Sequence, residues 1–157
     1  MTIVFTGGGT GGHFYPIIAI AEAINDLVHE ERLIAPSLYY LAPNSFDEKA
    51  LFENGITYIH IPAGKVRRYV SLRNITDPFI TVVGTVSALF TLFRLYPDVV
   101  MSKGGYGSVP TVLAARLLRI PIIIHESDAK PGRANLLAAK FADRIAISFE
   151  GAAKYFP

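Results

Sequence analysis

The stretch TIVFTGGGTGGHFY, residues 2–15, decides the fold of this chain. Its apolar beginning predicts a buried strand over Thr2–Thr6, and the five glycines that flank Thr10 predict a loop at which a ligand can approach the backbone closely. A helix is expected from about Pro16, with its free N–H groups and positive dipole end pointing into the same space. The segment is therefore typical of an anion site, and phosphate suits it best. His13 adds a side chain that titrates near neutral pH.

The composition restricts the class of protein. With 157 residues, 51% of them hydrophobic and 18% charged, the chain suits one folded domain over residues 1–157. It has no cysteine, which excludes disulfides and thiolate metal sites and fits a reducing cytosol. Its formal net charge of +2 is too small to predict a nucleic-acid partner.

Strand-like and helix-like segments alternate along the chain. This alternation predicts an α/β fold: a Rossmann-like open parallel sheet with helices on both faces. Further strands are expected at Leu38–Ala42, Thr57–Ile61, Asp98–Ser102, Pro121–His125 and Arg144–Ser148. Further helices are expected at Phe46–Glu53, Phe79–Phe93, Val109–Arg119 and Pro131–Phe141. Such sheets bind ligands at the carboxyl ends of their strands, so the loops there should converge on one cleft.

Two familiar phosphate-binding classes fit the first loop poorly. A dinucleotide-binding fold requires an acidic residue about 20 positions after the glycine loop to bind a ribose. The strand at Leu38–Ala42 carries no acidic residue. No lysine followed by serine or threonine ends the loop, as a Walker A loop requires. A purely structural strand–helix turn remains an alternative, although it needs fewer glycines.

A second glycine loop, residues 102–108, repeats the arrangement after another strand, with Ser108 expected as the helix cap and Pro110 in the first turn. Two such loops on adjacent strands favour two sides of one anionic ligand. The segment His125–Asp128 then ends an apolar strand with polar side chains, which usually line a site. The alternative is that Asp128 merely caps the next helix. The histidines show no metal-binding spacing.

The segment Phe79–Phe93 contains no charged residue and needs separate treatment. It is shorter than the roughly 20 apolar residues of a membrane span, so we expect a core helix packed on the sheet. A partly exposed helix in contact with a membrane is the alternative. A narrow polar stripe runs along it, made of Thr81, Gly84, Ser87, Thr91 and Arg94.

Taken together, these segments resemble the MurG family of UDP-N-acetylglucosamine transferases. Gly7–Pro16 is similar to the first glycine loop of that family, Gly104–Pro110 to the second and His125–Asn135 to its third signature. The similarity covers the whole chain and implies the amino-terminal, acceptor-binding half of a two-domain GT-B glycosyltransferase, without the carboxyl-terminal donor domain. Many members have Asn where Asp128 stands, and an ionised Asp only accepts hydrogen bonds.

The resemblance implies an inverting, metal-independent and cofactor-free transfer of GlcNAc from UDP-GlcNAc to the C4 hydroxyl of MurNAc in lipid I, which gives lipid II for peptidoglycan synthesis. It implies His13 as the general base, with Glu126 orienting or polarising it. The positions that correspond to donor contacts are Thr10, Gly11, Gly12 and Asp128. Those expected to bind the acceptor diphosphate are Gly9, Gly104, Gly105, Tyr106 and Ser108.

Because lipid I is lipid-linked, the resemblance also implies a peripheral location on the cytoplasmic face of the plasma membrane. The expected patch for anionic lipid comprises Lys65, Arg67, Arg68 and Phe79. Two alternatives stay open. One is a non-catalytic acceptor-binding or membrane-recruiting subunit of a split GT-B transferase, with its donor half in a partner chain. The other is a nucleotide-binding Rossmann protein unrelated to sugars.

Overall fold

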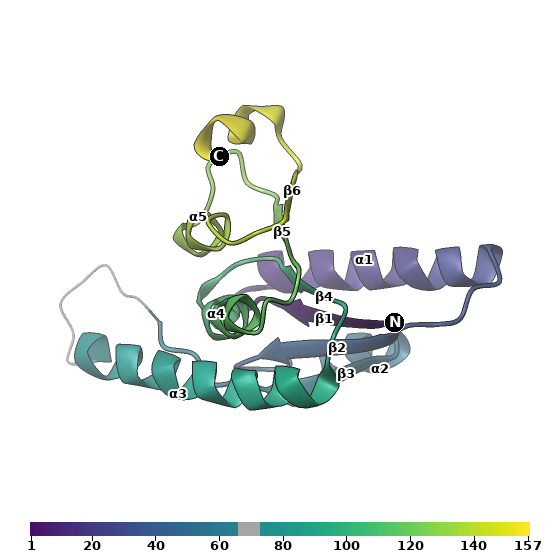
Figure 1. Ribbon diagram of the computed structural model, residues 1–157. Helices are drawn as coiled ribbons and strands as arrows, with labels where there is room; N and C mark the ends of the chain where they lie inside the picture. The colour runs from purple at the N-terminus through teal and green to yellow at the C-terminus, as the bar shows by residue number, and fades with distance from the viewer. Residues whose placement is uncertain (66–72) are drawn as a thin grey trace.

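The computed structural model describes residues 1–65 and 73–157. In these residues the strands form one parallel sheet. Within these residues the strand order is β3-β2-β1-β4-β5-β6, so the order reverses between β1 and β4 (Figure 1). The carboxyl edge at such a reversal is where open α/β sheets bind ligands. The strands are β1 Thr2–Thr6, β2 Ser37–Ala42, β3 Ile56–His60, β4 Val99–Ser102, β5 Ile122–Glu126 and β6 Arg144–Ile147.

Helices connect the strands and cover both faces of the sheet, which confirms the predicted fold class. Each predicted strand agrees with the observed one to within one residue at either end. The helices are α1 Gly11–Glu30, α2 Glu48–Glu53, α3 Arg73–Leu95, α4 Val109–Leu117 and α5 Arg133–Ala138, with 3-10 turns η1 Tyr106–Ser108 and η2 Glu150–Tyr155.

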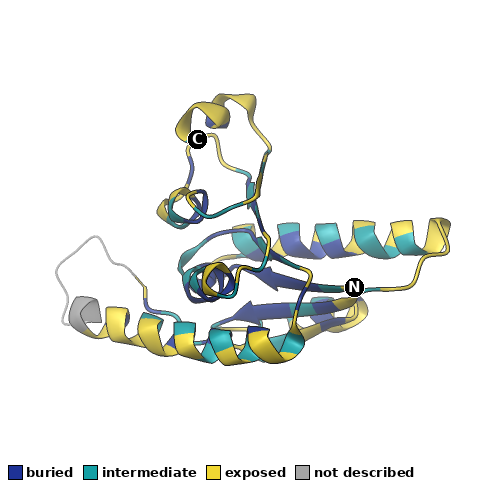
Figure 2. Cartoon of the chain, viewed as in Figure 1, coloured by how far each residue is buried: buried dark blue, intermediate teal, exposed yellow. Residues whose placement is uncertain are grey.

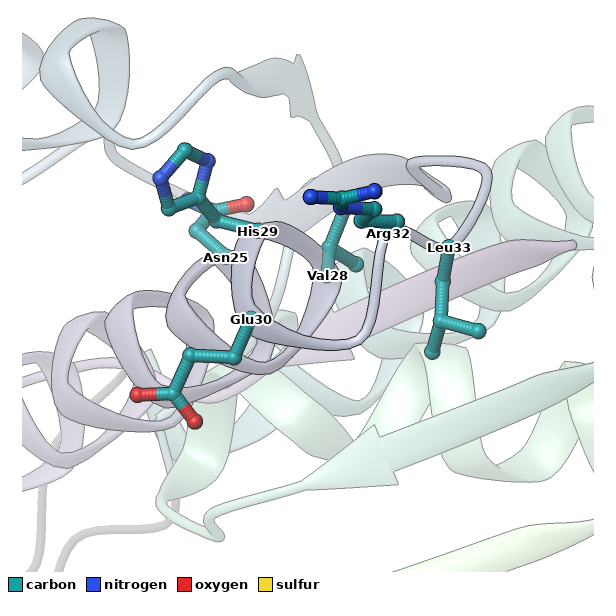
Figure 3. Close-up of a pocket in the computed structure, with 6 residues that line it drawn as sticks. All are labelled: Asn25, Val28, His29, Glu30, Arg32 and Leu33. Atoms are coloured by element: carbon teal, nitrogen blue, oxygen red, sulfur yellow. The ribbon is translucent and has the colours of Figure 1, made fainter.

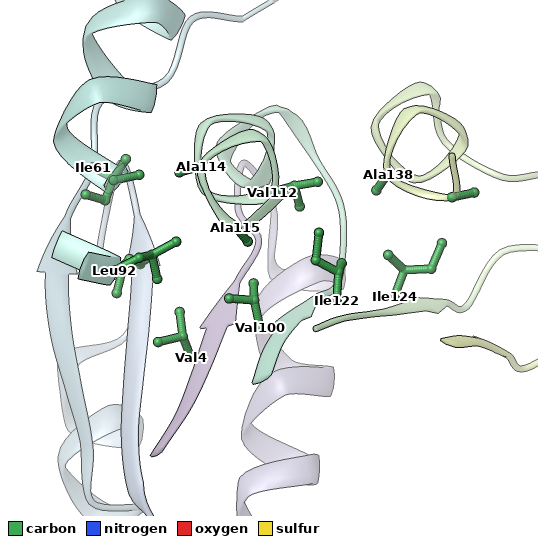
Figure 4. Close-up of a cluster of buried hydrophobic side chains, with 13 residues drawn as sticks. Val4, Ile61, Leu92, Val100, Val112, Ala114, Ala115, Ile122, Ile124 and Ala138 are labelled. Atoms are coloured by element: carbon green, nitrogen blue, oxygen red, sulfur yellow. The ribbon is translucent and has the colours of Figure 1, made fainter. Parts of the chain in front are cut away.

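The alternation of side chains along the strands produces two cores. On one face, Ile3, Phe5 and Tyr40 pack against the buried side of α1 and against α2. On the other face, Val4 and Val100 pack against residues of α3, α4 and α5 (Figure 4). Burial of both faces accounts for the nearly continuous apolar strands in the sequence.

The first helix begins earlier than the sequence predicts. It starts at Gly11 rather than near Pro16, because Thr10 is extended, with φ −153° and ψ 160°, and serves as the N-cap residue. Proline favours the first turn of a helix, but Pro16 lies inside this one. As a result, Gly11 and Gly12 belong to the first turn of α1, and their N–H groups have no carbonyl acceptor within the helix.

The expectation that Phe79–Phe93 is a core helix is wrong. The helix is longer, spanning Arg73–Leu95, and packs mainly on α4. Figure 2 shows exposed residues along the whole described length of the helix. Phe79 is 70% exposed and Phe93 is 71% exposed, whereas Leu92 is fully buried. By length and composition, Thr76–Leu95 is also apolar enough to cross a membrane, although one face packs against the rest of the fold.

Candidate active site

The two glycine loops pack backbone against backbone at the switch point. A Cβ atom on Gly105 would overlap the carbonyl oxygen of Gly8, and one on Gly107 would lie 2.7 Å from the carbonyl oxygen of Gly7. Gly9 has a φ of +103°, and a Cβ there would lie 2.7 Å from the Tyr106 ring. The glycines are therefore needed for this close approach, whatever else their N–H groups do.

His13 projects from the first turn of α1 and is oriented locally. Its Nδ1 is hydrogen-bonded to Thr10 Oγ1 at 2.8 Å. Burial lowers the pKa of His13 below its ordinary value and the Lys103 charge lowers it further, while Asp128 and Glu126 act in the opposite direction. The lowered pKa favours the neutral imidazole, which is the form that can accept a proton.

Glu126 organises the loop that follows β5. Its Oε1 accepts a hydrogen bond from the Asp128 N–H at 2.9 Å, and its Oε2 accepts from the Gly132 N–H at 3.2 Å and from Asn135 Nδ2 at 3.0 Å. Burial alone would raise the pKa of Glu126, but these hydrogen bonds and the Lys103 charge bring it below its ordinary value. The orientation of His13 expected from Glu126 is supplied by Thr10 instead, and Glu126 acts on the imidazole through its charge.

A cavity of about 550 Å³ brings the three sequence segments together. His13 from the first segment, Gly105 and Tyr106 from the second, and Glu126 and Asp128 from the third all line it. Its remaining walls come from α4, from α5 with the residues before it, from Gly64 in the segment after β3, and from Thr81 of α3. The expected convergence on one cleft is therefore confirmed.

Other predicted site residues lie around this cavity rather than in its lining. Thr10 and Gly12 are exposed and Gly11 is half-buried, all at the start of α1. Gly104 is buried, and a Cβ there would lie 2.6 Å from Asn135 Oδ1. Ser108 is buried at the end of η1, which closes the second loop.

The structure decides two questions about helix caps. Ser108 is the N-cap residue of α4, as the sequence predicts, but its hydroxyl makes no bond to a helix N–H and donates instead to the Gly105 carbonyl at 2.9 Å. The alternative that Asp128 merely caps the next helix is wrong, since Gly132 is the N-cap residue of α5 and that helix is shorter than predicted. Asp128 is therefore available at the cavity.

Two of the four residues of the predicted membrane patch, Lys65 and Phe79, lie within the residues that the structure describes. Lys65 is exposed, and its Nζ lies 5.7 Å from the centre of the Tyr106 ring, within the range of a cation–π contact. Phe79 lies on the exposed face of α3. Arg67 and Arg68 lie outside the described residues.

The sequence interpretation missed three residues around the site. Asn135 and Arg133 line the cavity from α5. Lys103 is buried, with only 3% of its surface exposed, and its Nζ is hydrogen-bonded to Ser127, between two residues of the cavity lining. The sequence does indicate that Lys103 is buried, because a lysine at the carboxyl end of a buried strand, immediately before a glycine pair, has little room to reach solvent.

A second depression, of about 640 Å³, lies at the opposite end of α1 (Figure 3). Its lining includes Asn25, His29 and Arg32. Because α1 starts at the carboxyl edge of the sheet, this depression lies away from the glycine loops. Among residues 1–65 and 73–157, no group of three or more His, Asp or Glu side chains is arranged to hold a metal ion. Metal independence stays a prediction.

The comparisons with known proteins identify this parallel sheet, with its two packed glycine loops, as the amino-terminal half of a GT-B glycosyltransferase fold. Residues 3–147 match the glycosyltransferase family 28 N-terminal domain, and the chain belongs to that family. It is 42% identical over 156 residues to a UDP-N-acetylglucosamine–N-acetylmuramyl-(pentapeptide) pyrophosphoryl-undecaprenol N-acetylglucosamine transferase 2 of Bacillus cereus. It is 43% identical over 155 residues to the corresponding transferase of Treponema pallidum.

These matches cover 99% of the chain but only 42% and 39% of the relatives. The crystal structure of Acinetobacter baumannii MurG superposes with a TM-score of 0.79 at 29% identity, over 99% of this chain and 43% of that one. The chain therefore corresponds to the amino-terminal domain of MurG and spans less than half the length of the curated relatives.

Proposed function

We propose that this chain is the acceptor-binding half of an inverting transferase that moves GlcNAc from UDP-GlcNAc to the C4 hydroxyl of MurNAc in lipid I. The observation that carries the proposal is the cavity whose lining includes both His13 and Thr81 of α3. Its wall therefore offers a base and also includes a residue of a helix whose other face is apolar and exposed. A lipid-linked sugar needs both features close together.

In this proposal His13 is the general base. In this role Nδ1–H donates to Thr10 Oγ1, which leaves Nε2 unprotonated and able to accept the proton of the acceptor C4 hydroxyl. The hydroxyl oxygen then forms a bond to C1 of GlcNAc as the bond from C1 to the UDP oxygen breaks, and UDP leaves with the electron pair. Attack opposite the leaving group inverts the configuration at C1. A positioned base contributes typically about 10²–10⁴-fold to such a step.

Backbone donors at the start of α1 supply positive potential without a metal ion. The N–H groups of Gly11 and Gly12 are unpaired within the helix, and the helix dipole adds to them. We assign Thr10, Gly11, Gly12 and Asp128 to the donor side. The acceptor diphosphate is assigned to the second loop with Gly9, that is, to Gly9, Gly104, Gly105, Tyr106 and, as a support beneath them, Ser108.

The exposed face of α3 suits a membrane surface. Phe79, Val83, Phe90 and Phe93 recur at helical spacing and are each at least 60% exposed. Lys65 and the two arginines that follow it would add attraction to anionic lipid, worth about 1 kcal/mol per basic residue. The proposed location is therefore peripheral, on the cytoplasmic face of the plasma membrane.

The test uses a chimera in which residues 1–157 replace the matching part of the Bacillus cereus relative. It is assayed with UDP-GlcNAc and a soluble lipid I analogue. Turnover by the chimera, with none from the 157-residue chain alone, supports the proposal. A chimera that binds the analogue without turning over would favour a non-catalytic acceptor-binding subunit instead. Tight NADH binding would favour a Rossmann protein unrelated to sugars.

A further inference from the structure

Lys103 is a buried cation that the proposed chemistry does not use. Its backbone N–H donates to the Thr6 carbonyl at 2.9 Å, which fixes it at the switch point beside the first glycine loop. Its side chain is only 3% exposed. Burial of an ammonium group is costly unless hydrogen bonds and opposite charges compensate for it. The position of this lysine therefore indicates a specific role.

The hydrogen-bond partner of Lys103 lies on a different loop. Nζ donates to Ser127 Oγ at 2.8 Å, across 24 positions of sequence. Ser127 lies between Glu126 and Asp128, the two carboxylates at the cavity. Burial lowers the pKa of Lys103, and the charges of Glu126 and Asp128 oppose that lowering. The lysine is thus held by a hydroxyl and faced by two acids.

We propose that Lys103 is a positioning residue for the transfer proposed above, on which this inference rests: its ammonium group holds the Ser127 hydroxyl and so fixes the loop that presents Asp128 to the cavity opposite His13. In the described part of the chain, Lys103 is not among the residues that line the cavity. It therefore acts through Ser127 and through its charge, not by contact with a substrate.

The same charge faces His13. The charged and titratable groups around this imidazole come from several elements and are Lys103, Tyr106, Glu126, Asp128 and Arg133. Besides burial, Lys103 disfavours protonation of His13, whereas Asp128 and Glu126 favour it. Loss of the lysine charge leaves two carboxylates without compensation, so the imidazole should bind its proton more tightly. The hydrogen bond to Ser127 therefore predicts an effect on the order of the Asp128 loop, and the charge of Lys103 predicts a separate effect on the titration of His13.

The test is made on the 157-residue chain by NMR, with the variants K103M, K103R and S127A. The first readout is the pH titration of the His13 ring, identified by its loss in H13Q. The second is hydrogen exchange of the Asp128 N–H, which donates to Glu126. K103M should move the His13 midpoint to higher pH and speed exchange at Asp128. S127A should speed exchange but keep the midpoint, and K103R should keep the midpoint because it keeps the charge.

Unchanged titration and unchanged exchange in K103M overturn the proposal, as does a lower melting temperature without either change. If K103M does not fold, wild-type exchange at Asp128 in S127A overturns it instead. Neither readout needs turnover, so failure of the proposed transferase activity would be seen separately, in the chimera. If the chimera is active, K103M should also move the acidic limb of its kcat/KM profile to higher pH.

Discussion

The helices α1 and α3 cover opposite faces of one sheet (Figure 1) but differ in whether their large apolar side chains are buried. Phe14 and Ile17 of α1 are at most 1% exposed, whereas Phe79 and Phe90 of α3 are 70% and 65% exposed. Both sequences have clear helical periodicity. Periodicity therefore identifies which residues share a face, but not which face packs against the fold.

The first half of the packed face of α3 consists of small and polar residues, whereas the second half is apolar and buries Ala88 and Leu92. A Cβ on Gly84 would overlap the Pro62 carbonyl oxygen, so this face approaches its neighbours closely. Thr81 Oγ1 donates to the Asp77 carbonyl at 3.0 Å, and Thr85 Oγ1 donates to the Thr81 carbonyl at 2.8 Å. These hydroxyls are satisfied within the helix, so burying them costs little.

The same substitution on the two helices tests the contrast most directly. Phe14→Ala should reduce the free energy of unfolding by about 3–5 kcal/mol, because it empties a buried aromatic site. Phe90→Ala should change it by no more than about 0.5 kcal/mol, because the side chain is exposed. Urea unfolding of both variants measures the difference. Equal losses would mean that α3 packs its apolar face inward.

A second pair tests the packed face of α3. Gly84→Ala should cost about 3 kcal/mol in overpacking against the Pro62 carbonyl, offset by about 1 kcal/mol of helix propensity. Its neighbour Val83 is 60% exposed, so Val83→Ala serves as the matched control with a small effect. A stabilised Gly84→Ala variant would contradict the close approach.

The chemistry is expected at the start of α1 and not on α3. His13→Ala in the chimera should reduce turnover at least tenfold, about 1.4 kcal/mol or more in the barrier, while barely changing the melting temperature. His29→Ala, on the same helix but exposed at its other end, is the control. Unchanged turnover, or a large fall in melting temperature, would refute the role of His13 as base.

The exposed face of α3 should carry membrane binding. We expect the chain to cosediment with anionic vesicles much more than with neutral ones, and less at high salt, since the Debye length is about 10 Å at 0.1 M. Replacing Phe90 and Phe93 with Ser, or Lys65, Arg67 and Arg68 together with Ser, should each remove most of this binding. Leu27→Ser on α1, where Leu27 is 52% exposed, is the control. If both sets of variants bind the vesicles as strongly as the unmodified chain does, the membrane contact lies elsewhere.

The smallest expected effect is the pH dependence of the free energy of unfolding that arises from two histidines near the site, one on α1 and one on β5. The pKa values of His13 and His125 are lowered from 6.5, in each case mainly by burial and then by Lys103. The unfolded chain therefore binds more protons just below pH 6.5, so stability is complete above that pH and falls as the pH drops through the folded-state values. Urea midpoints at several pH values measure this, and His13→Gln should flatten the slope. A midpoint that rises on acidification would contradict the assignment.

The sequence by itself determined the sheet and the place of the site. Strand, glycines and helix occur in local order, and the right-handed connection of parallel strands brings their carboxyl ends to one edge. The sequence therefore assigns residues as far apart as His13 and Asp128 to one site, and both line the same cavity. The sequence predicts the start of α1 too late because Gly11 and Gly12 have poor helix propensity, whereas in the structure the N-cap geometry at Thr10 overrides that propensity.

Only the tertiary structure decided which side of α3 faces inward and which residues support the site from behind. The contact from Lys103 to Ser127 joins two loops through side chains of flexible length, and no periodicity encodes it. The packing of Gly8 against Gly105 and of Gly84 against Pro62 depends on how closely two backbones approach. Local propensity and spacing fix the elements and their order, whereas such approaches depend on the balance of packing over the whole fold.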